Sequence, residues 1–248
     1  NSEFRILLAI LCARIAAPRR SAIEARGLFM HHATAGSFLG IPGVVWFWVL
    51  TIVGIGAVVL SLSRRFQLLR AGRPDDRFDR LGERFRHLLV YAFGQKRMFD
   101  DPVAGFYHLL IFYGFLVVSI RTVTMVLEGL FAGWELPLLH SPIGHAYLFS
   151  KDVFELLVLV GLVFAVWRRG IMKKERVIQS WGAWLVIGLI AILMVTDLVS
   201  EGARIAAGDL DGSFLPISSM VAGAFARLSP AALQAIYSAN WWIHLITL

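Results

Sequence analysis

The chain has 248 residues, of which 58% are hydrophobic, with a mean hydropathy of +0.69 and a formal net charge of +7. A soluble domain is normally about 45–50% apolar, and the excess here lies in long uncharged blocks, which is typical of an integral membrane protein. Basic residues of membrane proteins gather in cytoplasmic loops, so the positive charge indicates lipid contact and no nucleic-acid partner. The single cysteine, Cys12, excludes a disulfide framework and a cysteine-ligated metal cluster.

Both ends of the sequence are unusual for a membrane domain. Residues 1–40 are expected to form an N-terminal extension, and 1–29 contain five arginines and no stretch long enough to span a bilayer. This stretch either contains a signal-peptide core at 7–17 or is upstream sequence that precedes a true start at Met30. The other end stops inside the apolar run Trp241–Leu248. A helix does not end in mid-bilayer with unpaired carbonyls, so the membrane domain at 41–248 is expected to be truncated.

The apolar blocks predict the transmembrane segments in chain order. A span needs roughly 20 apolar residues, and complete spans are expected at about 42–62, 102–125, 149–167 and 181–200. A fifth span begins near Ile236 and is cut off. The stretch 214–225 is too short and is expected to lie at the surface or to be re-entrant. The predicted fold is therefore all-α, a polytopic transmembrane helical bundle of four complete spans plus a truncated fifth.

The distribution of basic residues predicts the orientation. Lys and Arg are frequent in 64–99 and 168–176, whereas 122–150 contains neither. The positive-inside rule then places 64–99 and 168–180 in the cytoplasm. A multi-pass protein of a bacterial or archaeal cytoplasmic membrane, with its N-terminus outside, is expected. The mixed charges of 79–89 predict an amphipathic surface helix, which is either simply solvated or a docking face for a soluble partner.

Two histidines lie inside predicted spans, where ionisable residues are costly and therefore candidates for function. His108 lies in span two and His244 in span five. Each is either an axial haem ligand or a core histidine hydrogen-bonded to neighbouring helices. Gly105 and Gly114 would let a flat macrocycle approach span two closely.

The topology separates these two histidines. Each lies about 9 to 12 Å below its own surface at a rise of 1.5 Å per residue, His108 in the cytoplasmic half and His244 in the outer half. In a bilayer core about 30 Å thick they cannot share one iron, so two ligands imply two haems. His140 and His145, before span three, are either polar loop residues or suppliers of the second ligand opposite His244.

Other charged residues in or near the spans have two readings each. Arg121 either pairs with a haem propionate or anchors span two at the interface. Lys151, Asp152, Glu155 and Asp197 are ionisable residues placed to serve as a proton relay. Alternatively, Lys151 and Glu155 form a helical i, i+4 pair and Asp197 lies near the interface.

Four segments in this order resemble a known family. They are FGQKRMFDDPVAGFYHLLIFYGF (93–115), LLHSPIGHAYLFSKDVFELLVLVG (138–161), WGAWLVIGLI (181–190) and NWWIHL (240–245). Together they resemble the cytochrome b domain of membrane-bound iron–sulfur oxidoreductases. These are the heterodisulfide-reductase-like proteins, which include the electron-transfer-flavoprotein:quinone type. That domain is in turn similar to the gamma subunit of respiratory nitrate reductase.

The resemblance implies a five-helix cytochrome with one or two haem b groups, followed by a cytoplasmic domain with cysteine-rich iron–sulfur motifs that is missing here. Electrons would pass between a cytoplasmic donor, such as an electron-transfer flavoprotein, and a membrane quinone. His108 matches the family's ligand in span two, and His244 matches the first ligand in span five. The nitrate reductase pattern has a second histidine where this chain has Val118, so the second haem is either absent or differently ligated. An ion or solute transporter subunit and a haemless membrane anchor for a soluble redox enzyme are the alternatives.

Overall fold

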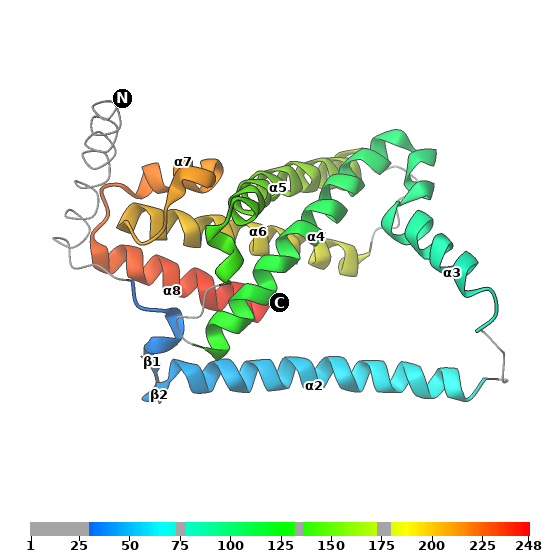
Figure 1. Ribbon diagram of the computed structural model, residues 1–248, viewed down its shortest axis with the longest axis horizontal. Coiled ribbons are helices and arrows are strands. Elements are labelled where there is room, and N and C mark those ends of the chain that lie inside the picture. The colour runs from blue at the N-terminus through cyan, green and yellow to red at the C-terminus, as the bar shows by residue number, and fades with distance from the viewer. Residues whose placement is uncertain (1–29, 73–77, 132–135, 173–179) are drawn as a thin grey trace, which may run out of the picture.

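The computed structural model describes residues 30–72, 78–131, 136–172 and 180–248, and the predictions for 1–29 lie outside the described residues. The described chain is nearly all-α, as predicted (Figure 1). Its α-helices are α2 (Gly43–Arg70), α3 (Leu81–His87), α4 (Pro102–Leu130), α5 (Pro142–Val166), α6 (Trp181–Ala207), α7 (Pro216–Phe225) and α8 (Pro230–Thr247). A hairpin of β1 (Ser37–Phe38) and β2 (Ile41–Pro42) precedes α2.

Short helical turns complete the described elements. The 3-10 turns are η1 (Ala33–Ala35), η3 (Lys96–Asp100), η4 (Pro137–His140) and η6 (Gly212–Phe214). Two π-helical turns, η2 (Leu88–Phe93) and η5 (Trp167–Ile171), extend α3 and α5. The mixed-charge segment predicted to be an amphipathic helix is therefore helical from Leu81 to Phe93.

Serine and aspartate caps determine where the long helices begin. Ser141, Ser180 and Ser229 each accept a hydrogen bond from the backbone N–H three residues on, as Asp101 does for α4. Such residues satisfy donors that have no partner inside the helix. As a result α5 begins at Pro142, seven residues earlier than the apolar block predicts, and α8 begins at Pro230, ahead of the predicted Ile236.

Three described helices, α2, α4 and α6, are long and apolar enough to cross a membrane, and they fit a membrane protein. The prediction of four complete spans and part of a fifth is not confirmed by this measure. Helix α5 has 25 residues but includes Lys151, Asp152 and Glu155, and the 18 residues of α8 include Gln234, Asn240 and His244, which lower its mean hydropathy. Because the three charged side chains of α5 are fully buried, composition alone underestimates how apolar its outer surface is.

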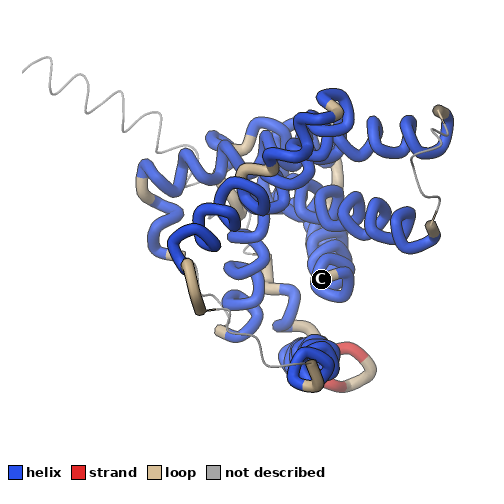
Figure 2. Tube along the Cα trace, turned by 90° about the vertical axis from the view of Figure 1, so that its right-hand side faces the viewer, coloured by secondary structure: helices blue, strands red, loops and turns tan. Residues whose placement is uncertain are grey.

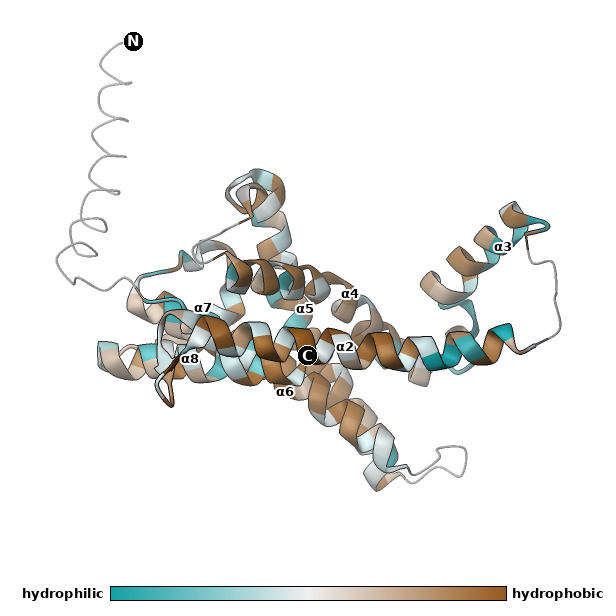
Figure 3. Ribbon diagram, turned by 90° about the horizontal axis from the view of Figure 1, so that it is seen from below, coloured by the Kyte–Doolittle hydropathy of each residue, from teal (hydrophilic) through white to brown (hydrophobic). Residues whose placement is uncertain are grey.

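Helices α4 to α8 pack together, and α2 lies along one side of them (Figures 1 and 2). Helix α2 joins the rest near its N-terminal end, where Phe47 is buried against Met125 and Trp241. The rest of α2 is an exposed apolar surface that ends in the polar turns around Arg64 and Arg70 (Figure 3). A second core cluster, formed by Val118, Val158, Leu162 and Met194, joins α4, α5 and α6.

An ion pair joins the end of α5 to the start of α4. The Arg168 guanidinium donates to the Asp101 carboxylate at 2.7 Å, which brings the end of α5 to the start of α4. This contact holds the pKa of Arg168 above its usual value. Arg168, just after α5, and Asp101, just before α4, therefore lie at the same end of the bundle.

Candidate functional site

His244 is buried on α8 and is held in place by α6. Its Nδ1 atom lies 2.9 Å from the Thr196 hydroxyl oxygen, and its side chain is only 3% exposed. The Thr196 hydroxyl itself donates to a carbonyl one turn earlier in α6, that of Ile192. Because Nδ1 is engaged, Nε2 is the ring nitrogen left to coordinate a metal.

His108 is half-buried on α4, and its ring stacks on Phe112 at a centroid distance of 6.4 Å. The two nearby glycines make close contacts with protein. A Cβ on Gly105 would collide with the Met98 carbonyl, and a Cβ on Gly114 would collide with the Val158 side chain. Their small size serves the packing of η3 and α5 against α4, and the open approach to a macrocycle expected at these positions is not seen.

The structure does not bring His108 and His244 together. Met194 packs against Val118, and Thr196, two residues after Met194, contacts His244. His244 is thus close to the level of Val118 along the bundle. Ten residues of helix separate Val118 from His108, which is about 15 Å at 1.5 Å per residue.

The histidines before α5 occupy a different environment. His145 lies in the first turn of α5, where its ring stacks on Phe214 at 4.0 Å with an interplanar angle of 8°. His140 ends the 3-10 turn η4, and its side chain lies outside the described part of the chain. Each was a predicted supplier of a ligand opposite His244, and that role stays a prediction.

His32, which the sequence did not single out, is the histidine with a buried ring nitrogen that lacks a hydrogen-bond partner among the described residues. Its ring lies edge-on against Trp241 at 5.1 Å, one helical turn from His244 on α8. Burial lowers the pKa of His32, so its imidazole is neutral at pH 7, the form that binds metals. No spacing motif in the sequence connects His32 to α8.

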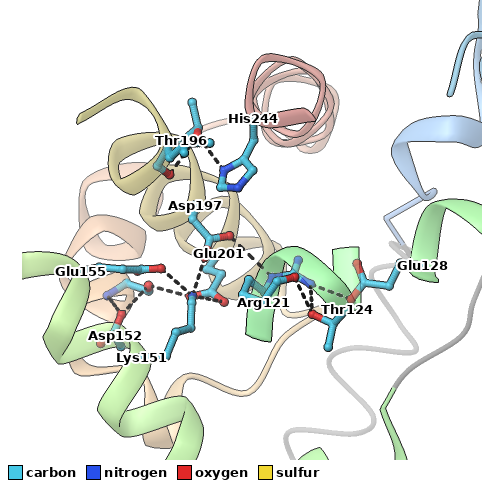
Figure 4. A network of polar contacts seen from close by, with 12 residues as sticks. Arg121, Thr124, Glu128, Lys151, Asp152, Glu155, Thr196, Asp197, Glu201 and His244 are labelled. Atoms are coloured by element: carbon cyan, nitrogen blue, oxygen red, sulfur yellow. Dashed lines mark hydrogen bonds and ion pairs between the residues drawn. The ribbon is translucent and has the colours of Figure 1, made fainter. Parts of the chain in front are cut away.

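A network of buried charges lies beside His244 (Figure 4). At its centre the Lys151 ammonium, 0% exposed, lies 3.1 Å from Glu155, 2.8 Å from Asp197 and 2.7 Å from Glu201. The i, i+4 pair of Lys151 and Glu155, one of the two alternatives that the sequence predicted for these residues, is therefore present. The other two partners come from α6, where Asp197 and Glu201 are themselves four residues apart.

Arg121 of α4 extends this network toward the end of that helix. Its guanidinium lies 2.7 Å from Glu128 and 3.6 Å from Asp197, and it donates to the Thr124 hydroxyl at 3.1 Å. Only 13% of its side chain is exposed, so it is not a solvated interfacial anchor. Its predicted pairing with a haem propionate stays a prediction.

Asp152 connects the same region to α7. Its carboxylate accepts hydrogen bonds from the backbone N–H groups of Ile217 at 2.6 Å and Ser218 at 3.0 Å. The residue at the N-cap of α7, Leu215, has no side chain that can cap the helix. Asp152 therefore caps α7 from another helix, and the partial positive charge of the helix N-terminus stabilises the carboxylate.

The arrangement favours a proton-binding network over a metal centre. Oxygen atoms of Asp152, Glu155 and Glu201 lie within 4.8 Å of one another, close enough to share an ion. The Lys151 ammonium, however, already lies in contact with Glu155 and Glu201. A divalent cation would face that positive charge at short range, which Coulomb repulsion in a buried site strongly disfavours.

Comparisons with known proteins find two similar oxidoreductases. The chain is 28% identical over 209 residues to the "Probable iron-sulfur-binding oxidoreductase FadF" of Bacillus subtilis, which covers 84% of this chain and 29% of that protein. It is 25% identical over 211 residues to the "EtfAB:quinone oxidoreductase" of Syntrophomonas wolfei, covering 80% of this chain and 29% of that protein. The chain thus spans less than a third of the length of these relatives. No protein-family model and no solved structure matches it.

Proposed function

We propose that this chain is the haem b-binding membrane domain of a quinone-linked oxidoreductase. It passes electrons between an iron–sulfur domain in the cytoplasm, outside this chain, and the quinone pool. The observation that carries the proposal is His244, a buried histidine oriented by Thr196. It lies in a chain similar over most of its length to an iron–sulfur-binding oxidoreductase and an EtfAB:quinone oxidoreductase.

The residues around His244 fit an axial haem ligand. Histidines that bind metals generally donate the second ring N–H to an oxygen atom, which fixes the tautomer and the ring orientation. Thr196 supplies that oxygen at Nδ1, and the buried Trp241 one turn away helps to exclude water. A bound haem would supply a one-electron carrier in this part of the bundle.

His108 is the second proposed ligand and belongs to a different haem. Its distance from the level of His244, about 15 Å along α4, supports two separate groups. In this proposal α5 and α8 are also membrane spans, because the buried position of Lys151 and Glu155 keeps their charges away from lipid. The basic segments around α3 and Arg168 then face the cytoplasm, and the N-terminus lies outside.

The physiological partners follow from the relative that is named for them. EtfAB:quinone oxidoreductase carries both an electron-transfer flavoprotein and a quinone in its name. We assign the same two classes to this chain, a flavoprotein as cytoplasmic electron donor and a quinone as the membrane substrate. Iron–sulfur clusters would connect them in the part of the protein outside this chain.

A reduced-minus-oxidised absorbance spectrum tests the haem assignment. Membranes containing the complete gene product should show b-type absorbance, and His244→Ala should remove the contribution of one haem. His87→Ala, which changes a histidine at the end of the exposed helix α3, should leave the spectrum intact. Absence of any b-type absorbance, or a spectrum unchanged in both His244→Ala and His108→Ala, would overturn the assignment.

The same measurement identifies the ligand opposite His244. His32, His140 and His145 are the candidates, and only the true ligand should reproduce the loss seen in His244→Ala. The structure favours His32, because its buried Nε2 atom lacks a hydrogen-bond partner among the described residues. The sequence favours His140 and His145.

An ion or solute transporter subunit is the second candidate function, because a charge network inside a membrane bundle also suits an ion path. It predicts flux of an ion across proteoliposomes without b-type absorbance. A haemless anchor for a soluble redox enzyme predicts neither signal.

A further inference from the structure

We propose that Glu155 binds a proton inside the bundle and exchanges it along a chain of polar groups that ends at α7. The use of this proton rests on the proposed function, because reduction of a quinone consumes two protons together with two electrons. The electrons come from the iron–sulfur donor named above, Glu155 supplies one of the two protons, and water at the membrane surface supplies the other. The binding of the proton itself rests only on the arrangement of the described residues.

The first argument is the balance of charge around Lys151. Five carboxylates, from Glu128, Asp152, Glu155, Asp197 and Glu201, meet two cations, Arg121 and Lys151. The N-terminus of α7 compensates part of one charge, that of Asp152. Uncompensated negative charge is strongly unfavourable in a buried site, so a proton is the simplest additional counter-charge.

The second argument is the environment of Glu155 compared with the other carboxylates. Its side chain is 0% exposed, and neither of its oxygen atoms receives a hydrogen bond from a fixed donor among the described residues. Its ion pair with Lys151, at 3.1 Å, is the longest that this ammonium makes. Asp197, by contrast, has both Lys151 and Arg121, and Glu201 has Lys151 and the Ser218 hydroxyl.

The third argument is the contact between two carboxyl groups. Glu155 and Asp197 are neighbours because both contact the Lys151 ammonium, at 3.1 and 2.8 Å. Two carboxylates have only acceptor atoms, so they can hydrogen-bond only when one of them carries a proton. Asp197 is the better stabilised anion of the two because it has two cationic partners. A proton on this pair therefore belongs to Glu155, the less stabilised anion of the two.

A polar chain connects Glu155 to α7. The Ser218 hydroxyl lies 2.7 Å from Asp152 and 3.0 Å from Glu201, and Glu201 shares Lys151 with Glu155. One hydroxyl has a single hydrogen to donate and two lone pairs to accept. Ser218 can therefore donate to one carboxylate at a time, and when a proton from Glu155 reaches Glu201, the hydroxyl can accept from that carboxyl group while it donates to Asp152.

The groups that face Glu155 come from every helix packed around it. They are Arg121 of α4, Lys151 and Asp152 of α5, Asp197 and Glu201 of α6, Ser218 of α7 and, beyond Asp197, His244 of α8. Within this set Glu155 is the carboxylate with a single cationic partner and no other fixed donor. That combination assigns it the proton.

Infrared spectroscopy on the complete protein in membranes tests this assignment. A protonated carboxylic acid has a C=O stretching band that is separate from carboxylate bands and shifts in heavy water. We expect such a band at pH 7, its loss in Glu155→Gln and its retention in Glu128→Gln. Glu155→Asp keeps a carboxyl group, so it should move the band to another frequency. This variant tests the assignment even if Glu155→Gln fails to fold.

Absence of the band at pH 7, or a band that persists unchanged in both Glu155→Gln and Glu155→Asp, would overturn the proposal. The absorbance spectrum is recorded on the same samples. A carboxylic acid band without b-type absorbance leaves the proton site standing and rejects the haem assignment. B-type absorbance without the band rejects the proton site and leaves the haem assignment standing. If both are present, the band should change intensity on reduction with excess quinone; an unchanged band would overturn the role in quinone chemistry.

Discussion

Lys151 shows how individual residues of this chain acquire their roles. From the sequence it is one member of an i, i+4 pair with Glu155, worth a few tenths of a kcal/mol on an exposed helix. In the folded chain the same ammonium is fully buried and also contacts Asp197 and Glu201 from α6. Its partners 46 and 50 residues away have no periodicity that links them to α5, and only helix packing reveals them.

The first prediction at this scale concerns stability. Lys151→Met leaves three buried carboxylates without their shared cation, and removing one partner of a buried ion pair costs about 3–5 kcal/mol. Thermal unfolding in detergent, followed by tryptophan fluorescence, should show this loss. Lys96→Met changes an exposed lysine at the start of η3 and should leave the midpoint nearly unchanged. Equal midpoints for both variants would show that the contacts of Lys151 do not stabilise the fold.

His32 and Glu201 illustrate what sequence reasoning missed among single residues. His32 lies outside the predicted spans, and Glu201 lies just beyond the predicted end of the fourth span at residue 200. Helix α6 continues to Ala207, which makes Glu201 a helical residue one turn after Asp197. The i, i+4 spacing of these two carboxylates was a usable signal, since it places both on one face of α6.

At the level of elements, the apolar blocks predicted the long helices well and their ends less well. Hydrophobic length indicates where a chain is buried in lipid, whereas caps such as Ser141 and Ser229 determine where the helix begins. Helix α7 was expected as a surface or re-entrant segment. It packs on α6, where Gly202 meets Val221, and its N-terminus is capped by Asp152 from α5.

The second prediction concerns the attachment of α2. A Cβ at Gly129 of α4 would overlap the Phe47 ring, and α2 has few other buried residues. Gly129→Ala should therefore lower the free energy of unfolding by about 1–3 kcal/mol through overpacking. Gly56→Ala, on the open side of α2 with nothing within 4 Å of the new Cβ, should be neutral or slightly stabilising because alanine is the better helix former. The idea fails if Gly129→Ala is as stable as Gly56→Ala.

At the scale of the whole molecule, the charge distribution leads to a prediction of orientation. In a background with Cys12→Ser, Gly82→Cys marks the basic segment after α2, and Ser213→Cys marks the turn between α6 and α7. Both positions are exposed. A membrane-impermeant thiol reagent added to intact cells should label Ser213→Cys, whereas Gly82→Cys should react only after lysis. Gly56→Cys, inside α2, should react in neither case. The reverse labelling pattern would place the N-terminus in the cytoplasm and reject the proposed orientation.

The resemblance to iron–sulfur oxidoreductases and the structure support the same function from different directions. Similarity in sequence extends over most of the chain but under a third of each relative. The structure adds a buried histidine with an oriented ring and, beside it, a network of charges. Electron transfer and proton binding would thus occur in neighbouring parts of one bundle, which is the arrangement that quinone chemistry requires.

The sequence by itself determined the helical class, the apolar segments and the alternation of basic and neutral loops, because hydrophobic length and charge are local properties of the chain. It also identified His244 and the charged residues of α5 as costly inside a membrane. Only the tertiary structure decided which of them meet. Lys151 joins Asp197 and Glu201, Asp152 caps α7, and Thr196 orients His244 because the packing of whole helices brings distant residues to one level, and no local pattern encodes that contact.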